Sequence, residues 1–324
     1  MNPDQPPSVA LVLGAGGARG LAHIGVIEAI EARGLRIAAI AGTSMGALVG
    51  GIYASGQLPA YRDWALGLTR SDVFRLLDFG IGRPGLFTGD RLMAELQQIV
   101  GQHRIESLPI PFTAVATDLR AQREVWLTRG PLFDSVIVVP FEWLTQGPLF
   151  DAIRASMAIP LVFTPVKLGG RELVDGGLLN PVPIAAMRQA LVDVVIAVDV
   201  NARTASARTR ESQPANGGAR ESARLPVAAG GEADAEEETV GSMFAQWFTR
   251  KAGEQAKTGL VDLMARSLDT MQGQLSRMQL AFDPPDILIR IARDSSFFYE
   301  FWRTGELIEI GRKQADHALD AAGY

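Results

Sequence analysis

The sequence predicts an α/β protein built on a layered, mainly parallel β-sheet. The chain has 324 residues, 47% of them hydrophobic, so it is long enough to bury a large core. Its first 54 residues alternate two apolar, strand-like runs with two segments of helical periodicity, and this βαβα order is typical of parallel sheets. Further β-branched runs recur along the chain between segments that favour helix.

The N-terminal elements are predicted in the order strand, glycine-rich loop, helix, strand, helix. The first strand spans residues 9–13 and ends in the stretch GAGGARG, residues 14–20. The next segment ends at Gly34 and carries apolar side chains at helical spacing, namely Leu21, Ile24, Ile27 and Ile30. A second strand, residues 37–41, leads into GTSMG and a helix that ends near Ala54.

Six more strands are predicted from short runs rich in β-branched and aromatic residues. They are Phe112 to Thr117, Glu124 to Thr128, Val162 to Leu168, Glu172 to Val174, Val194 to Val200 and Ile287 to Ile291. Helices are expected in much of the sequence between them.

Residues 202–240 differ in composition from the rest of the chain. They are rich in Ala, Gly, Ser, Arg and Glu and contain no aromatic residue, so we expect a disordered loop.

The chain is therefore expected to divide into three parts. Residues 1–201 carry the motifs described below, residues 202–240 form the loop, and residues 241–324 add a helical extension with a strand and helix that complete the first part.

A long amphipathic helix is expected after this loop. Its large apolar residues follow steps of four and three, namely Leu260, Met264, Leu268, Met271, Leu275, Met278 and Phe282. Such a stripe predicts a helix that packs against the core, and a lid that contacts lipid is the alternative.

One short repeat is present. The segment VWLTRGPLFD at residues 125–134 returns as EWLTQGPLFD at residues 142–151, and two copies do not make a solenoid. We interpret it as a local duplication that adds residues 135–146 as an extra hairpin or loop. Because this segment is apolar and contains Phe141 and Trp143, it either packs on the protein's own surface or enters a membrane interface.

Composition excludes several classes of function. A net charge of −5 provides no attraction from a distance toward nucleic acid or a strongly anionic membrane. The chain has no cysteine, which excludes disulfides, thiolate metal sites and a cysteine nucleophile and makes the cytoplasm the natural compartment. We find neither a signal-peptide pattern nor an apolar run of membrane-spanning length, so membrane contact is expected to be peripheral, on the inner face.

Ser44 lies in GTSMG, between a β-branched strand and a helix of small residues. In a sharp strand-to-helix turn a nucleophile is held in a strained conformation, and Gly42 and Gly46 allow the strand and helix backbones to approach closely. This context predicts that Ser44 is a nucleophile. A serine that only caps the helix is the plainer alternative.

A nucleophilic serine needs a base, and the usual partner is histidine. Of His23, His103 and His317, only His317 fits the usual chain order of serine, acid and histidine. Asp175 in RELVDGGLLNPVP is the better candidate, because it follows a short strand and precedes two glycines, and desolvation in an apolar crevice would raise its basicity. A plain Asp-Gly turn is the alternative.

The glycines of residues 14–20 stand between a strand end and a helix start. Converging backbone N–H groups at such a place bind phosphates or a developing oxyanion. The dinucleotide pattern G-x-G-x-x-G fails because Arg19 occupies its last glycine position, and no Walker sequence is present. The loop therefore favours an oxyanion site over a nucleotide-binding enzyme.

The motifs GAGGARGLAHIGV, GTSMG, AIRASMAIP and VDGGLLNPVP occur in this order in the chain. Together they resemble the patatin-like phospholipases, in the bacterial branch that is similar to the lysophospholipase domain of neuropathy target esterase. The resemblance covers roughly residues 8–200 and resumes near the C-terminal strand and helix. It implies a modified α/β-hydrolase fold, a three-layer α/β/α sandwich.

This resemblance also implies a lipid acyl hydrolase with a Ser-Asp dyad. Ser44 would be the nucleophile and Asp175 the base, and the amides of Gly16, Gly17 and Ala18 would form the oxyanion hole.

Arg19 matches the family's basic position in that loop, where it would fix the loop, meet a head group, or remain a solvated charge. The sequence departs from the family at Ala15, where glycine is common, and in the duplication before AIRASMAIP, which would reshape the acyl pocket.

The expected reaction is hydrolysis of a fatty acyl ester, without a metal or other cofactor and hence without calcium. Phospholipid, lysophospholipid and simple carboxyl esters all fit, and no nucleic-acid partner is expected. A non-catalytic membrane or signalling adaptor that keeps the same fold is the alternative.

Overall fold

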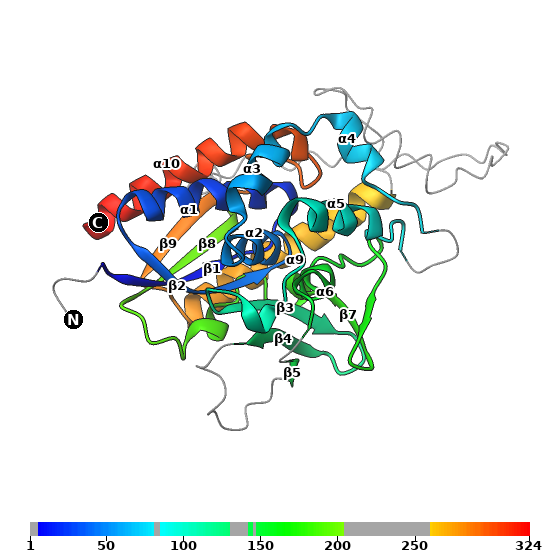
Figure 1. Ribbon diagram of the computed structural model, residues 1–324, viewed down its shortest axis with the longest axis horizontal. Coiled ribbons are helices and arrows are strands. Elements are labelled where there is room, and N and C mark those ends of the chain that lie inside the picture. The colour runs from blue at the N-terminus through cyan, green and yellow to red at the C-terminus, as the bar shows by residue number, and fades with distance from the viewer. Residues whose placement is uncertain (1–5, 81–84, 130–141, 145–146, 204–259) are drawn as a thin grey trace, which may run out of the picture.

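A nine-stranded sheet organises the part of the chain that the computed structural model describes, residues 6–80, 85–129, 142–144, 147–203 and 260–324 (Figure 1). The strands are β1 Ser8–Leu13, β2 Arg36–Thr43, β3 Phe112–Asp118, β4 Arg123–Arg129, β5 Glu142–Leu144, β6 Val166–Leu168, β7 Arg171–Asp175, β8 Val194–Ala202 and β9 Ile287–Ala292. Their order is β5-β4-β3-β2-β1-β8-β9, with β7 joined to β3 and β6 to β7. Five strand pairs are parallel and three antiparallel, which confirms the predicted fold class.

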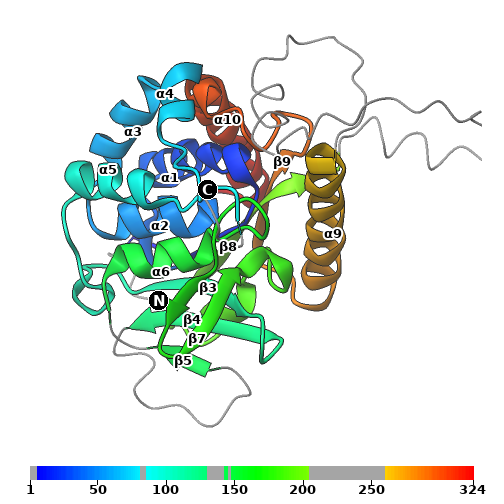
Figure 2. The same ribbon diagram turned by 90° about the vertical axis from the view of Figure 1, so that its right-hand side faces the viewer.

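Helices cover one face of this sheet thickly and the other thinly (Figures 1 and 2). The α-helices are α1 Ala22–Ala32, α2 Met45–Ala54, α3 Leu58–Leu66, α4 Arg70–Arg75, α5 Asp90–Val100, α6 Leu149–Ser156, α9 Leu260–Phe282 and α10 Thr304–Ala322. The short 3₁₀ helices are η1 Gly17–Leu21, η2 Ile105–Ser107, η3 Gly176–Leu178, η4 Ile184–Met187 and η5 Phe301–Arg303. No helix among the described residues is long and apolar enough to cross a membrane.

The strand β1 is buried on both faces and separates two cores. Val9, Leu11 and Leu13 belong to the large core beneath α1, α2 and α10, whereas Ala10 and Val12 belong to a smaller core that includes η4. Successive side chains of a strand point to opposite faces, so one apolar run supplies both cores. This explains why every residue from Val9 to Leu13 is apolar.

Five of the six further strands are confirmed, with boundaries within two residues of those expected. The strand expected over residues 162–168 is wrong in its first half, because β6 begins at Val166. The preceding residues form a turn in which the amides of Val162 and Phe163 donate to the Ile159 carbonyl. Leu161, inside this turn, has a φ of 70°, which a strand does not allow.

The first three residues of the two copies of the repeat lie side by side in the parallel strands β4 and β5. The register pairs equivalent positions of β4 and β5, namely Val125 with Glu142, Trp126 with Trp143 and Leu127 with Leu144. Strands joined by a tight hairpin are antiparallel, so β4 and β5 are not the two arms of one, and an extra hairpin or loop within residues 135–146 stays a prediction. The remainder of the added segment, and residues 204–240 of the expected loop, lie outside the described residues.

Helix α9 turns its predicted apolar stripe toward solvent. Met271, Met278 and Phe282 are 53%, 49% and 85% exposed, and Figure 2 shows the helix on the outside of the molecule, beside β8 and β9. The helix contacts the protein through its polar face, on which Ser276 is fully buried. The expectation that the stripe packs against the core is wrong for Met271, Met278 and Phe282, whereas Leu268 and Leu275 are half-buried; the side chains of residues 260–265 are not described.

Candidate active site

Strand β3 brings Ser44 and Asp175 to the same place. β2 runs parallel to β3 and ends with Thr43 opposite Val115. β7 runs antiparallel to β3 and ends with Asp175 opposite Ala116. Because β4 occupies the whole other edge of β3, β2 and β7 share one edge and meet end to end. Two carboxyl-terminal strand ends therefore face each other, with Ser44 following one and Asp175 closing the other.

The turn that holds Ser44, called the elbow below, spans Gly42 to Gly46 and depends on close backbone packing. Ser44 has φ 56° and ψ −122°, a strained conformation for a residue with a side chain. A Cβ on Gly42 would lie 2.3 Å from the Gly46 carbonyl oxygen, and one on Gly46 would lie 2.0 Å from that of Leu13. The Ser44 side chain makes no capping hydrogen bond to α2. Its hydroxyl is therefore held at the turn without serving the helix.

Ser156 supports this turn from α6. The Ser44 backbone amide donates to Ser156 Oγ at 2.9 Å, and Ser156 Oγ donates to the Val115 carbonyl at 2.6 Å. Ser156 is fully buried, so this relay satisfies two backbone groups that water cannot reach. Sequence reasoning assigned no role to Ser156, although it lies in the motif AIRASMAIP, which was the available signal.

Asp175 is a buried carboxylate with raised basicity. Burial raises its pKa to about 6, against opposing interactions with the Ser44 hydroxyl and the Gly177 amide. Oδ1 accepts the Gly177 N–H at 2.7 Å. Oδ2 has no hydrogen-bond partner of standard geometry among the described residues, so it is the oxygen available to accept a proton.

The glycine-rich loop, residues 14–20, differs from expectation at one amide. The Ala18 N–H donates to the Phe298 carbonyl at 2.8 Å, so it is already occupied. The amides of Gly16 and Gly17 donate to no group in the described part of the chain. Gly17, with a φ of 56°, lines the same cavity as Ser44. An oxyanion hole in this loop thus has two available amides, not the three expected.

Arg19 fixes this loop from inside the protein. The side chain is buried and donates to Asn201 Oδ1 at 2.8 Å and to the Arg293 carbonyl at 3.0 Å, and it forms an ion pair with Asp269 of α9. Asn201 also donates to the Ala15 carbonyl at 2.7 Å. The interpretation of Arg19 as a solvated charge is therefore wrong. Asn201 was missed because nothing near it in the sequence marks it as a partner of the loop.

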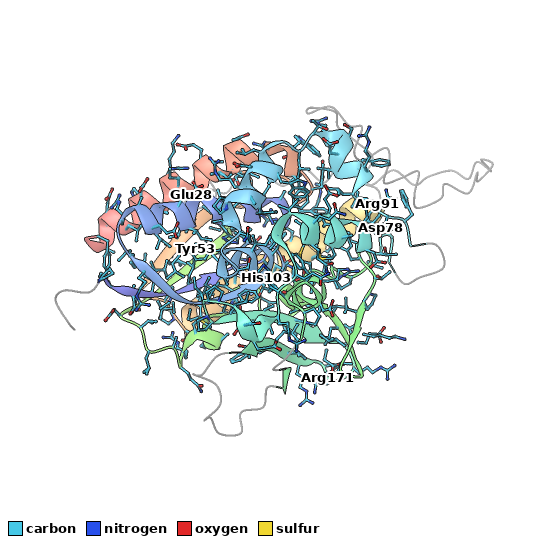
Figure 3. The ribbon with its side chains drawn as sticks, viewed as in Figure 1. Glu28, Tyr53, Asp78, Arg91, His103 and Arg171 are labelled. Carbon is cyan, nitrogen blue, oxygen red and sulfur yellow. The ribbon has the colours of Figure 1, made fainter. Side chains whose placement is uncertain are left out.

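None of the three histidines, all of which lie in described segments, hydrogen-bonds to the serine or the aspartate. His23 is fully buried with Nε2 2.8 Å from the Gly14 carbonyl oxygen, and burial lowers its pKa to about 4, so it is neutral near pH 7. His103, labelled in Figure 3, places Nε2 2.9 Å from the Val100 carbonyl oxygen. His317 is exposed on α10. The histidine triad thus has no geometric support.

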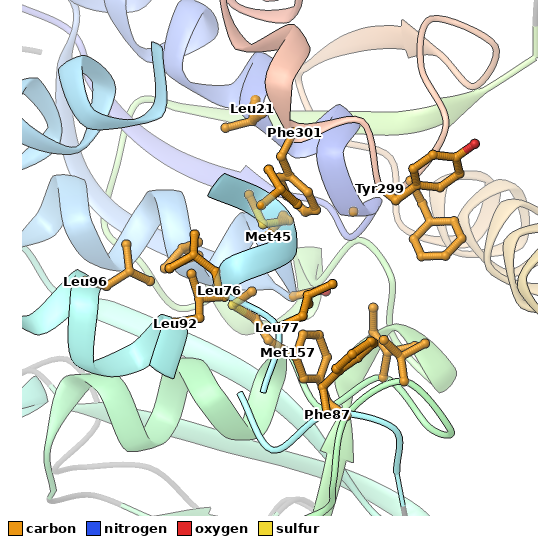
Figure 4. A pocket seen from close by; sticks show the side chains of 18 of the residues that line it. Leu21, Met45, Leu76, Leu77, Phe87, Leu92, Leu96, Met157, Tyr299 and Phe301 are labelled. Atoms are coloured by element: carbon orange, nitrogen blue, oxygen red, sulfur yellow. The ribbon is translucent and has the colours of Figure 1, made fainter. Parts of the chain in front are cut away.

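An apolar cavity of about 100 Å³ opens beside Ser44. No charged side chain lines it, and Figure 4 shows Met45, Leu77, Phe87 and Met157 around it. One water needs roughly 10–15 Å³ on the same measure, so this space can take several methylene groups of an acyl chain. Among the described residues, no group of three or more His, Cys, Asp or Glu side chains is placed to hold a metal ion.

Comparison with known proteins identifies the family. The family model described as patatin-like phospholipase matches residues 11–188. The chain belongs to the patatin-like phospholipases. An uncharacterized NTE family protein of Mycobacterium tuberculosis is 39% identical over 349 aligned residues, covering 97% of this chain and 92% of that protein. Membership implies lipid acyl hydrolase activity.

Two further matches are more distant. The human patatin-like phospholipase domain-containing protein 6 is 32% identical over 203 residues, which cover 60% of this chain and 14% of that protein. The crystal structure of VipD from Legionella pneumophila aligns with a TM-score of 0.40 and 12% identity, covering 98% of this chain and 67% of that one.

Proposed function

We propose that this patatin-like phospholipase hydrolyses fatty acyl esters of lipids through Ser44 and Asp175. One observation supports the proposal: β2 and β7 meet along β3, so a strained serine and a buried carboxylate follow facing strand ends, and the serine lines an apolar cavity. Substrates of this site are phospholipids, lysophospholipids or other fatty acyl esters. The acyl chain would occupy the cavity while the polar part of the substrate remains outside it.

The first half of the reaction forms an acyl-enzyme. Ser44 Oγ attacks the ester carbonyl carbon while Asp175 takes the hydroxyl proton. The negative charge that develops on the carbonyl oxygen is stabilised by the amides of Gly16 and Gly17. When the carbon–oxygen ester bond breaks, Asp175 returns the proton to the leaving alcohol.

The second half releases the fatty acid. Water attacks the acyl-enzyme, Asp175 accepts its proton, and the proton passes to Ser44 Oγ as the acyl group departs as a carboxylic acid. A pKa of about 6 suits this base, because Asp175 is ionised near pH 7 yet more basic than an exposed carboxylate. No step requires a metal, so we expect activity to persist when calcium is removed with a chelator.

We further propose that the protein acts in the cytoplasm and touches the inner face of a membrane peripherally. The absence of cysteine suits a reducing compartment. Peripheral contact is supported by the apolar cavity, which needs an acyl chain delivered from a lipid aggregate.

The test is hydrolysis of a short-chain p-nitrophenyl ester and of lysophosphatidylcholine by the wild type and three variants. Ser44→Ala and Asp175→Asn are each expected to lose about 10⁴-fold in kcat/KM, as members of catalytic units do. His317→Ala, the matched control, keeps wild-type activity. Circular dichroism and thermal unfolding verify that each variant folds.

Two results would contradict this function. If His317→Ala were as inactive as the serine variant, a histidine triad would operate. If the wild type hydrolysed neither ester and did not react with a fluorophosphonate probe, the non-catalytic adaptor would be the better account.

A further inference from the structure

Exposed apolar side chains gather where the cavity meets the surface. Eleven large hydrophobic residues of the described chain are exposed, and five of them lie within two positions of a residue that lines the cavity. We call four of these the apolar rim: Phe74 (41% exposed), Phe79 (49%), Leu161 (51%) and Phe297 (62%). They come from α4, from the segment after it, from the turn before β6 and from the segment before η5.

A run of aromatic rings connects the rim to the inside of the cavity. Phe74 lies 6.4 Å from Phe79 between ring centroids, Phe79 lies 5.2 Å from Phe87, and Phe87 lies 6.3 Å from Phe163. Phe87 is buried, and both it and Phe163 line the cavity that contains Ser44. Continuous apolar contacts therefore run from the exposed rim to the cavity that contains Ser44.

Leu161 has a strained backbone and an exposed side chain. Its φ of 70° is a left-handed conformation that costs a non-glycine residue on the order of 1 kcal/mol, and half of its side chain is exposed. The Leu161 carbonyl accepts the Leu86 amide at 3.0 Å, which holds the turn against the segment that carries Phe87. A strained backbone that presents an apolar side chain to water is unfavourable in a free protein, and contact with an apolar phase would offset it.

Hydrogen bonds connect the segment after α4 to the start of α5, and arginines lie beside the rim. Asp78 accepts the amides of Gly89 and Arg91 at 2.8 and 3.3 Å, and Asp78 and Arg91 lie together in Figure 3. Arg70 and Arg75 begin and end α4, which carries Phe74, and the Arg75 side chain is 78% exposed and pairs on the surface with Asp72 at 3.6 Å. Apolar groups flanked by arginines match the acyl and phosphate layers of a lipid surface.

We propose that the apolar rim is the surface by which the protein docks on a lipid–water interface and through which the acyl chain enters the cavity. The proposal rests on the proposed function, because it assigns the rim to delivery of the lipid substrate. The continuity between rim and cavity favours a lipid surface over a protein partner, since a protein that covered the rim would block the way to Ser44.

The test compares two double variants that remove exposed apolar groups from different faces. Phe74→Gln with Leu161→Asn changes the rim, and asparagine tolerates the left-handed backbone of position 161. Met278→Gln with Phe282→Asn is the matched control on α9, where the side chains are exposed to a similar or greater degree. None of the four residues lines the cavity or belongs to the proposed catalytic groups.

The measurements are sedimentation with vesicles of phosphatidylcholine and phosphatidylglycerol, hydrolysis of lysophosphatidylcholine carried in those vesicles, and hydrolysis of water-soluble p-nitrophenyl acetate. The rim variant is expected to lose about tenfold in vesicle affinity and in the rate of vesicle hydrolysis. Phe74 and Leu161 are each about half exposed, and the substitutions remove that exposed apolar surface from the contact with lipid. Hydrolysis of the soluble ester should stay within about twofold of the wild type. The α9 variant should match the wild type in all three measurements.

Several results would overturn the docking surface. They are a wild type that does not bind vesicles, a rim variant that binds as well as the wild type, equal loss in the α9 variant, and conversion of a dimer to a monomer by the rim variant with unchanged vesicle binding. If the wild type bound vesicles through the rim but hydrolysed neither ester, the docking surface would stand and the proposed function would fail.

Discussion

The elbow around Ser44 and the glycine-rich loop are both strand-to-helix turns, at the ends of the neighbouring parallel strands β2 and β1, yet they are held in different ways. The elbow is shaped mainly by the close backbone approaches that its own glycines permit, Gly42 against Gly46 and Gly46 against Leu13, with one distant support from Ser156. The loop is shaped by residues far along the chain, such as Asn201 and Phe298. The glycines that permit the nucleophile turn can thus be recognised within five residues, whereas the contacts that hold the glycine-rich loop come from residues that only the completed fold brings near it.

The largest effect that separates the two turns should come from adding one methyl group. Gly46→Ala would place a Cβ 2.0 Å from the Leu13 carbonyl oxygen, where only backbone could move. Gly16→Ala would place a Cβ 2.3 Å from a methyl of Val200, a side chain that can shift. We expect a loss of at least about 3 kcal/mol in the free energy of unfolding for the first and about 1–2 kcal/mol for the second, measured by urea denaturation. Equal losses would show that the two turns do not differ in how tightly backbone encloses their glycines.

Asp175→Asn should stabilise the protein while it abolishes activity. Burial raises the pKa of Asp175 from its ordinary 3.8 to about 6, so the folded chain holds the proton more tightly and stability falls as the pH rises between these values. Above pH 6 the buried charge opposes folding by about 3 kcal/mol, which the neutral asparagine removes. Urea denaturation at pH 8 should show this gain, and denaturation below pH 4 should not. A variant less stable than the wild type at pH 8 would show that the charge is compensated.

Two single substitutions probe the supports of the two turns. Ser156→Ala leaves the Ser44 amide and the Val115 carbonyl buried without their partner, so we expect a loss of about 1–3 kcal/mol in the free energy of unfolding. Asn201→Ala releases the Ala15 carbonyl and one contact of Arg19, while Asp269 still pairs with that arginine. It should cost about 1 kcal/mol in stability and about tenfold in kcat/KM.

For each of these two variants, the loss of stability is to be compared with the loss of kcat/KM. Thermal unfolding measures the first, and hydrolysis of a soluble ester measures the second. If Asn201→Ala left kcat/KM unchanged, the loop would not need its distant support for the reaction.

The sequence was sufficient to predict most of the strands, the tight turn at Ser44 and the position of Asp175 at a strand end, because each depends on local signals. Gly42 and Gly46 mark the close approach, and the glycines after Asp175 mark its tight surroundings. The end-to-end meeting of β2 and β7 required knowledge of strand order, which residue patterns do not contain. The occupied Ala18 amide was equally hidden, because its acceptor at Phe298 is distant in sequence.

Helix α9 shows the limit of periodicity. The spacing of Met271, Met278 and Phe282 correctly indicates one apolar stripe on a helix, but it does not say whether the protein or another phase covers that stripe. The structure turns the polar face inward, where Asp269 pairs with Arg19 and Arg293. Hydrophobicity alone predicts the opposite orientation of α9, because it takes no account of these polar contacts with the glycine-rich loop.

The most direct test of the Ser44–Asp175 pair is the pH dependence of kcat/KM for a soluble ester, measured on the wild type and on Asp175→Asn. The wild-type value should rise with pH to a plateau, with an apparent pKa of about 6, because Asp175 must be ionised to accept the serine proton. The asparagine variant should be about 10⁴-fold slower and lack this rise. If the variant kept the same rise, a group other than Asp175 would be the base, and the account of the dyad would be wrong.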